Sequence, residues 1–363
     1  MKICQNCFCD TEIKSIIASR KTSGVCDVCG SDSYVYDTTT SGDLVDILDD
    51  FLNMYKKVQP SVPQELRRNL EKELIYGWHI LSPNCEHQVK NIVDSIYSFS
   101  NDTRERFDCN LFDDDVYIPQ IMDYDCLTKY SILQQFTWDD FTRKIKYDNR
   151  YHSEILNTQA FDAFISPLVK IYPANTCFYR ARISGNKLLA PKEMRIPPIE
   201  KRRAGRIGAE GIPCFYLTND IDTAIKEVRA GAFDYVTVAK FKLKNEIKVV
   251  DLRLLDNISP FSVSDPVSLA INKDTLLMLK SEVEKPIRAT ENTIEYIPIQ
   301  YFCDYIRSKD FMGIVYNSTM STQGYNLSAF SDSHFNLVNR KLYYINNLSV
   351  GFTQTTNRCN RTS

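Results

Sequence analysis

The stretch Gly211-Ile-Pro-Cys-Phe-Tyr-Leu-Thr-Asn-Asp-Ile-Asp-Thr-Ala-Ile-Lys-Glu-Val-Arg229 contains, in order, the signals for a strand, a turn and a helix. A short apolar run leads into an Asn-Asp pair, which is typical of a turn. The carboxylates of Asp220 and Asp222 are both suitable N-caps, so we expect a helix to start near one of them. Glu227 then lies one to two turns into that helix. If the strand and the helix pack as neighbours, Tyr216 and Glu227 share one cleft.

The sequence that follows this stretch predicts further strands. Residues 234–243 (DYVTVAKFKL) alternate apolar and polar side chains at a period of two, as a half-buried strand does. We expect more strands at 247–252, 311–316 and 341–345, and a helix over about 263–284 between them. These elements follow one another without a regular βα repeat, which predicts a mixed α+β domain.

The first half of the chain has a different pattern. Few β-branched alternating runs occur before residue 165, whereas apolar residues recur at helical spacing over 43–52, 86–97 and 125–146. Residues 31–42 are polar and are predicted to be a linker. The overall fold class predicted is therefore α+β, with an N-terminal helical part. The domains expected after the first segment of the chain are a helical domain over 36–165, an α+β domain over 166–350 and a polar tail over 351–363.

The composition excludes several classes of protein. A length of 363 residues predicts two or three domains. The chain has 44 Lys and Arg against 46 Asp and Glu, a net charge of −2, so we expect no strong nucleic-acid binding through a large positive field. No apolar run approaches the roughly 18 residues that span a bilayer, and Met1–Gln5 has no apolar secretory core. We expect a cytoplasmic protein that does not associate with membranes.

Two Cys-x-x-Cys motifs lie in the first 29 residues, with 18 residues between them. Each motif can present two sulfurs to one ion from a tight turn, and two such turns complete a tetrahedral set. We therefore predict a structural Zn²⁺, in a zinc-ribbon-like segment over residues 1–35, with the ligands Cys4, Cys7, Cys26 and Cys29. Cys9 is an alternative to Cys7 as a ligand. Four thiolates leave no open position on the metal, so such a site would be structural or partner-binding rather than catalytic.

Polar side chains gather at three other places in the second half. Arg180 and Arg182 follow an apolar run, and the loop 195–206 holds five cations against one acid. Guanidinium groups bind phosphate oxygens bidentately, so these residues could hold a pyrophosphate. Farther along, a strand ends in a cluster of hydroxyl and amide side chains that includes Ser318 and Asn326. Such a cluster can supply hydrogen bonds at the mouth of a ligand site.

Taken together, these segments resemble the RES domain, a family named after an Arg, a Glu and a Ser. The resemblance covers about residues 170–335 and depends on the order and spacing of several short motifs. Two features depart from the family pattern: Gly208 stands where an Asn is usual, and Ser318 is flanked as Asn-Ser-Thr. The helical block with its cysteine-rich start resembles the HEPN-like N-terminal region that accompanies some RES domains. The motifs that carry the RES resemblance are Phe178-Tyr-Arg-Ala-Arg182, Ala204-Gly-Arg206, Gly211-Ile-Pro-x-x-Tyr-Leu217, Thr223-Ala-x-x-Glu-Val-Arg229 and Gly313-Ile-Val-Tyr-x-Ser318.

The resemblance implies NAD⁺ as the substrate and a fold similar to that of ADP-ribosyltransferases. Members of the family act as bacterial toxins, in toxin–antitoxin pairs, or as antiphage defence effectors that deplete NAD⁺ by hydrolysis or phosphorolysis. Some are reported to transfer ADP-ribose to protein instead. By motif position, Arg180 and Arg206 would hold the phosphates of NAD⁺ or an incoming phosphate. Tyr216 would stack on the nicotinamide or the adjacent ribose.

The resemblance also assigns the residues at the bond that breaks. Glu227 would bind the nicotinamide ribose and stabilise the positive charge that develops at its anomeric carbon, as a carboxylate can do electrostatically. Ser318 would hydrogen-bond the nicotinamide or the ribose and fix its pose, and Asn326 is a further candidate for substrate binding. Nicotinamide leaves as a neutral molecule, so the reaction needs no strong general acid.

Three functions stay open at this point: an NAD⁺ glycohydrolase or phosphorylase, an ADP-ribosyltransferase that modifies a macromolecule, and an inactive zinc-bearing interaction protein. A HEPN ribonuclease is not favoured, because no Arg of the helical block precedes a His by four to six residues. A toxic NAD⁺ consumer must be restrained, either by a protein partner that inhibits or activates it or by its own helical domain. The sequence is compatible with a homodimer, and Arg182 stays an alternative to Arg180 at the substrate.

Overall fold

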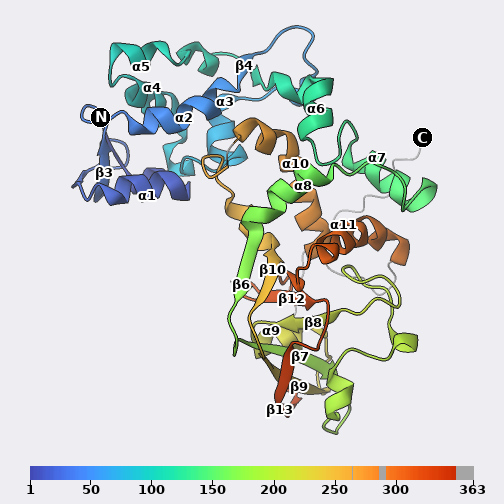
Figure 1. Ribbon diagram of the computed structural model, residues 1–363. Coiled ribbons are helices and arrows are strands. Elements are labelled where there is room, and N and C mark those ends of the chain that lie inside the picture. Colours follow the sequence, from blue (N-terminus) through green and yellow to red (C-terminus); the bar gives the residue numbers. More distant parts are fainter. Residues whose placement is uncertain (264, 286–291, 349–363) are drawn as a thin grey trace. The chain divides into compact units, whose positions relative to one another are not determined.

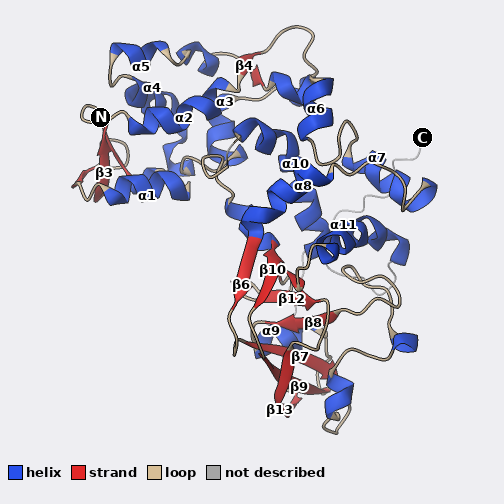
Figure 2. Cartoon of the chain, in the orientation of Figure 1, coloured by secondary structure: helices blue, strands red, loops and turns tan. Residues whose placement is uncertain are grey.

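The computed structural model describes residues 1–363 except 264, 286–291 and 349–363. The chain divides into two compact units, Met1–Pro167 with Leu254–Leu279 and Leu168–Arg253 with Lys280–Ser363. Helices predominate in the first unit and strands in the second (Figure 1, Figure 2). Helices together with a large mixed sheet are consistent with the predicted α+β class. The predicted polar tail over 351–363 lies outside the described residues.

The first unit begins with a small antiparallel sheet of order β1-β3-β2. The central strand β3 (Asp32–Asp37) pairs with β1 (Lys2–Cys4) on one side and β2 (Ser23–Val25) on the other. The prediction of a polar linker over 31–42 was therefore wrong. The backbone of this polar segment is paired by its neighbours on both edges, and the side chains of Val35 and Tyr36 are fully buried, whereas Tyr34 is exposed.

Helices make up most of the rest of the first unit. The helix predicted over 43–52 is confirmed as α2 (Asp43–Asn53), which buries Leu44, Leu48 and Phe51 at helical spacing. The C-terminal part of the helix predicted over 86–97 is confirmed as α4 (Val89–Tyr97), and a 3-10 turn precedes it. None of the helices in the described ranges has the length and apolar character needed to span a membrane.

The helical pattern predicted over 125–146 is confirmed in part, because a loop interrupts it. The segment forms α6 (Tyr124–Tyr130) and α7 (Trp138–Arg143) with a loop between them. The loop turns into the core: Ile132 is fully buried, and its N–H donates to Asn272 Oδ1 at 2.6 Å. Burial of apolar side chains in this loop thus outweighs the local helical pattern. The other α-helices and strands described in this unit are α1 (Thr11–Ser19), β4 (Lys56–Lys57), α3 (Leu70–Lys72), α5 (Asn101–Glu105), β5 (Val116–Tyr117), α8 (Thr158–Ile165) and the larger part of α10 (Pro266–Glu284).

The second unit is built around an eight-stranded sheet of order β13-β9-β7-β8-β12-β11-β10-β6. β10 and β11 run parallel, and the other neighbouring strands are antiparallel. The strands predicted at 234–243, 247–252 and 311–316 are confirmed, and residues 341–344 belong to the longer β13. The strands are β6 (Val169–Tyr172), β7 (Cys177–Ile183), β8 (Phe215–Thr218), β9 (Tyr235–Leu243), β10 (Ile247–Asp251), β11 (Gly313–Asn317), β12 (Tyr325–Ala329) and β13 (Phe335–Tyr344).

Apolar side chains cover both faces of this sheet. On one face the rings of Phe215, Phe241 and Phe335 meet edge to face, with centroids 5.0 and 5.5 Å apart. On the other face Val236 and Val238 pack with the side chains of α9 (Ile221–Glu227). Successive residues of a strand point to opposite faces, so the period-two pattern of β9 supplies both cores. Among the described residues of this unit, the α-helices are α9, the end of α10 (Pro266–Glu284) and α11 (Ile297–Ser308).

The sheet opens in its middle, between β7 and β8. These two strands share a single residue pair, Tyr179 with Thr218, whereas β7 pairs with β9 over its whole length. Strands that pair at one point diverge on either side of it, because a regular ladder would hold them a fixed distance apart. The separation of β7 and β8 leaves room for a cavity at this position.

Candidate active site

A cavity of about 550 Å³ lies in the second unit, where β7 and β8 diverge. Its wall includes residues of β7, β8, α9, β11, β12, the loop before β8 and the end of α10. Five of the six substrate-site residues predicted from the sequence lie on this wall, and the sixth, Ser318, contacts one of them. The five residues on the wall are Arg180, Arg206, Tyr216, Glu227 and Asn326.

Glu227 is the last residue of α9 and lies at the centre of a hydrogen-bonded group. The helix starts where the sequence indicated: Asp220 is its N-cap, and the Asp220 side chain accepts from the N–H of Thr223 at 2.8 Å. Glu227 Oε1 accepts from Ser318 Oγ at 2.6 Å and from Asn326 Nδ2 at 2.9 Å. Oε2 of Glu227 accepts no hydrogen bond from the described residues. The carboxylate is therefore held by one oxygen, and the other is available to a ligand.

The loop that carries Ser318 reaches Glu227 because of a glycine. The N–H of Ser318 donates to the carbonyl of Gly324 at 3.0 Å, which closes the loop between β11 and β12. A Cβ on Gly324 would lie 2.7 Å from Cγ2 of Thr223, a fully buried residue in the first turn of α9. A residue with a side chain at 324 would push this loop away from α9, and Ser318 with it. Ser318 is 7% exposed and lies behind Glu227 rather than among the described residues on the cavity wall.

Arg180 extends from β7 into the cavity. Its Nη1 donates to the carbonyl of Tyr216 at 3.4 Å, and its guanidinium lies 5.1 Å from the centroid of the Phe215 ring. Burial, together with repulsion from Arg182, lowers the pKa of Arg180 to about 10, so the group is still cationic at neutral pH. Arg182 donates instead to the carbonyl of Arg195 at 3.2 Å and is not among the described residues of the cavity wall. The geometry thus favours Arg180 over Arg182 as the substrate contact.

Arg206 is 6% exposed and reaches the cavity from the loop before β8. Its Nη1 donates to the carbonyls of Glu282 and Val283 at 3.3 and 3.4 Å. These carbonyls belong to the last turn of α10, where a helix has no internal donors for them and where a cation is favourable. Arg206 therefore holds the end of α10 in place as well as contributing positive charge to the cavity.

Tyr216 of β8 approaches the Arg206 loop closely. A Cβ on Gly205 would lie 2.7 Å from the Tyr216 hydroxyl, so glycine is needed there for the ring to reach its position. Gln300 of α11 fixes the loop by donating to the carbonyl of Gly205 at 2.6 Å. At Gly208, where the family pattern has Asn, a Cβ would lie 3.0 Å from Cβ of Cys214. Burial raises the pKa of the Tyr216 hydroxyl well above its usual range. The residue as a whole is 38% exposed and lies on the cavity wall.

Several residues of the cavity wall have no sequence signal that assigns them a role. Among the described residues that line it, five are cations and two are carboxylates, a surplus of three positive charges that suits an anionic ligand. Arg229 stood in the motif around Glu227 but was assigned no role. Glu284 and Lys285 had no local signal, because the end of α10 comes to this wall through the tertiary fold. The residues that were given no role include Tyr179, Arg229, Glu284, Lys285 and Tyr316, whereas Arg203 belongs to the cationic loop already considered for a pyrophosphate.

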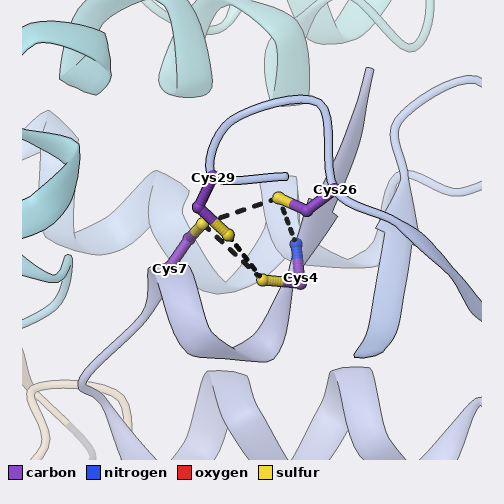
Figure 3. A group of neighbouring side chains, drawn as sticks. All are labelled: Cys4, Cys7, Cys26 and Cys29. Carbon is purple, nitrogen blue, oxygen red and sulfur yellow. Dashed lines mark hydrogen bonds between the residues drawn. The ribbon is translucent and has the colours of Figure 1, made fainter. Parts of the chain in front are cut away.

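The first unit contains the predicted group of four cysteines. Figure 3 shows the sulfurs of Cys4, Cys7, Cys26 and Cys29 directed toward one another. The Sγ–Sγ distances from Cys4 to Cys29, Cys7 to Cys26 and Cys4 to Cys7 are 3.4, 3.6 and 3.7 Å. Tetrahedral zinc with Zn–S bonds of about 2.3 Å requires sulfurs about 3.8 Å apart, so the donor set fits this ion. Cys9 is exposed and lies outside the group, which favours Cys7 as the ligand.

One thiol of this group is already acidic without a metal. Hydrogen bonding with Ser31 lowers the pKa of Cys29 to about 6, whereas burial raises the pKa of Cys4 to about 11. The N–H of Cys4 also donates to Cys26 Sγ at 3.2 Å, which would stabilise a thiolate. Since thiolates are the metal-binding form, a divalent cation would favour deprotonation of the whole group.

The comparisons with known proteins agree with part of the sequence analysis. Residues 178–345 match the sequence model of the RES domain, and this range contains the Arg, Glu and Ser of the predicted motifs. No curated protein matches the chain. Among solved structures, the crystal structure of the M. tuberculosis MbcT–MbcA toxin–antitoxin complex is similar at 13% identity and a TM-score of 0.30, over 49% of this chain and 89% of that chain. A TM-score of this size carries no structural argument. The HEPN-like resemblance of the helical block stays a prediction.

Proposed function

We propose that the chain degrades NAD⁺ by cleaving the bond between nicotinamide and ribose, as a glycohydrolase or a phosphorylase. The observation that supports this most directly is the group formed by Glu227, Ser318 and Asn326 at a cavity with surplus positive charge. The RES match over 178–345 covers the same residues. A carboxylate fixed beside cationic side chains suits a substrate that is anionic at its phosphates and cationic at its pyridinium ring.

The proposed reaction needs a negative charge close to the anomeric carbon of the nicotinamide ribose. As the glycosidic bond breaks, nicotinamide leaves with the bonding electron pair and positive charge develops on the ribose at its anomeric carbon. The Glu227 carboxylate stabilises this charge electrostatically because its position is fixed before the reaction starts. The oxygen of water or of inorganic phosphate then bonds to the anomeric carbon; when water attacks, one proton is released. Both outcomes use the same first step.

The other residues have roles that follow from their positions. Arg180 has a guanidinium on the cavity wall and would bind the pyrophosphate of NAD⁺ or an incoming phosphate, to which Arg206 adds positive charge. Tyr216 presents an aromatic ring to the cavity and would stack on the nicotinamide or the ribose. Ser318 lies behind Glu227, so we propose that it orients the carboxylate rather than touching the substrate.

The test is NAD⁺ turnover with identification of the products. The purified chain is incubated with NAD⁺, with and without inorganic phosphate, and the products are separated by chromatography. Release of nicotinamide with ADP-ribose indicates hydrolysis, and a phosphorylated ADP-ribose that appears only with phosphate indicates phosphorolysis. Label from NAD⁺ retained on protein or nucleic acid would support the ADP-ribosyltransferase alternative. Unchanged NAD⁺ under all these conditions would contradict the proposal.

We also propose that the four cysteines of the first unit bind a structural zinc ion. The sulfur spacing and the closed set of four donors support this, and the site would stabilise the small β1-β3-β2 sheet. Cys4 ends β1, and Cys26 and Cys29 lie between β2 and β3, so one ion would join the two edge strands of this sheet at one end of it.

The biological role proposed is that of a toxin or defence effector whose NAD⁺ consumption stops growth unless it is restrained. The RES match supports this at the level of the domain. Induced expression in bacteria should lower cellular NAD⁺ and stop growth, and Glu227→Gln should do neither. Equal toxicity of the two proteins would contradict an NAD⁺-based role.

A further inference from the structure

Glu284 is a second carboxylate on the cavity wall, and no sequence motif includes it. It is the last residue of α10, and its side chain is 16% exposed. Glu284 Oε1 accepts from the N–H of Asn317 at 3.0 Å, and Oε2 accepts from Lys280 Nζ at 2.9 Å. Both oxygens therefore have a donor, and the carboxylate has one defined position.

The Asn317 bond connects Glu284 to the catalytic group. Asn317 ends β11 and precedes Ser318, whose hydroxyl is 2.6 Å from Glu227 Oε1. The N–H of Ser318 is held in turn by the carbonyl of Gly324. The peptide N–H of Asn317 is thus bonded to Glu284, and the next peptide N–H, that of Ser318, is bonded to the carbonyl of Gly324 in the same loop. Loss of the first anchor would allow the chain to shift at the residue that orients Glu227.

The end of α10 is a fixed support for this bond. Arg206, which is 6% exposed, donates to the carbonyls of Glu282 and Val283, the two residues before Glu284. Arg206 therefore fixes the C-terminal end of α10. Glu284 at that end fixes the N–H of Asn317, and the next residue, Ser318, hydrogen-bonds Glu227. Each link is a hydrogen bond between segments that are distant in the sequence.

We propose that Glu284 is a positioning residue for the catalytic group: through Asn317 it fixes Ser318, and through Ser318 it fixes Glu227. This inference rests on the proposed NAD⁺ cleavage for its effect on rate. A displacement of about 1 Å at a reacting group can cost roughly 10²-fold in rate, so loss of the anchor should lower kcat more than it raises KM.

The positioning role of Glu284 must be distinguished from a purely structural role in stabilising the end of α10. Glu284 also pairs with Lys280, whose side chain is 12% exposed, and loss of that ion pair alone could destabilise the helix end. Lys280→Met/Glu284→Gln and Lys280→Met/Glu284→Ala both lack the ion pair. They differ in one respect, since the Gln oxygen can still accept from the N–H of Asn317. Asp274→Asn removes an exposed acid from the same helix and serves as the control.

The experiment measures kcat and KM for NAD⁺ in the full-length chain, together with amide hydrogen exchange of Asn317. We expect Lys280→Met/Glu284→Ala to lower kcat by about 10- to 100-fold, with KM changed by less than about threefold. Lys280→Met/Glu284→Gln should keep kcat within about fivefold of wild type and keep Asn317 protected from exchange, because it retains the hydrogen bond. Asp274→Asn should match wild type in both.

Two results would overturn the inference. One is equal kcat and equal Asn317 protection in the two double variants, which would leave Glu284 a purely structural residue. The other is a rise in KM without loss of kcat, which would make it a substrate-binding residue. Hydrogen exchange does not depend on activity: if wild type fails to cleave NAD⁺, the proposed function fails, while the link from Glu284 to Ser318 is still decided by the protection of Asn317.

Discussion

Replacement of Glu227 by Gln tests the electrostatic argument at the centre of the site. The substitution keeps the shape of the side chain and removes its charge. Glu227 Oε1 accepts from Ser318 Oγ at 2.6 Å and from Asn326 Nδ2 at 2.9 Å, and the amide oxygen of Gln can accept the same two bonds. The geometry of the site should therefore persist, and any change in rate reports the lost charge.

The size of the effect follows from Coulomb's law. A carboxylate about 4 Å from a developing unit positive charge contributes about 4 kcal/mol at an effective dielectric constant of 20. This corresponds to roughly 10³-fold in rate. Loss of a single preorganised group at other enzyme sites costs about 10²- to 10³-fold in kcat, which agrees with that figure. We therefore expect Glu227→Gln to lower kcat by about 10³-fold and to change KM by less than about fivefold, since ground-state contacts are kept.

The assay is the initial rate of nicotinamide release, followed by chromatography over a range of NAD⁺ concentrations. Thermal unfolding of each variant verifies that the fold is intact, and Glu246→Gln, an exposed glutamate in the turn between β9 and β10, is the matched control. A Glu227→Gln protein that keeps more than about a tenth of the wild-type kcat would refute the electrostatic argument. So would an unchanged kcat with a raised KM, because the carboxylate would then bind substrate without favouring the transition state.

Three further predictions test the rest of the structure. Metal analysis of the purified chain should find a zinc ion that Cys26→Ser removes and that Cys9→Ser, which changes an exposed thiol outside the group, retains. Gly324→Ala should destabilise the second unit by about 1–3 kcal/mol, because the new Cβ would lie 2.7 Å from Thr223 Cγ2; a denaturant midpoint equal to that of wild type would contradict this close contact. Arg180→Lys should raise KM for NAD⁺ by about tenfold with a smaller effect on kcat, because an ammonium cannot bind phosphate bidentately; equal KM values in steady-state kinetics would exclude Arg180 as a phosphate ligand.

The residues around Glu227 show how much of the site the sequence could predict. The strand that carries Tyr216 and a helix start near Asp220 or Asp222 follow from local signals, because turns and caps depend on side chains within a few residues. The structure decides that Asp220 is the N-cap and that the helix ends at Glu227, which was expected to lie inside the helix. A cluster of hydroxyl and amide side chains at a strand end marked Ser318 and Asn326, and the family resemblance gave Ser318 its role. The contact of Asn326 with Glu227 comes from sheet pairing, in which Asn326 is paired with Thr218 on one side and Tyr316 on the other. Ser318 reaches Glu227 through the loop that Gly324 closes.

The linker predicted over 31–42 and the uninterrupted helical pattern predicted over 125–146 differ from the structure for the same reason, which is contact with residues remote in sequence. The segment that contains β3 was predicted to be a linker because its residues are polar, but pairing on both edges makes it the centre of a sheet. The helix predicted over 125–146 is interrupted because Ile132 is drawn into the core and its N–H is bonded by Asn272, 140 residues away in the chain. Neither outcome could be inferred locally, since the partners that decide it are remote in sequence.

Local order along the chain is enough to predict several strands of the second unit, a helix start near Asp220 or Asp222, and the paired cysteine motifs. The resemblance to the RES domain adds the choice of Glu227 as the acid. Local order cannot specify that Arg206 supports the end of α10, that Glu284 anchors Asn317, or that β7 and β8 diverge to form a cavity. The reason is physical: capping and periodicity act over a few residues, whereas a cavity and the hydrogen bonds that hold its wall require segments brought together by burial of the sheet's two apolar faces.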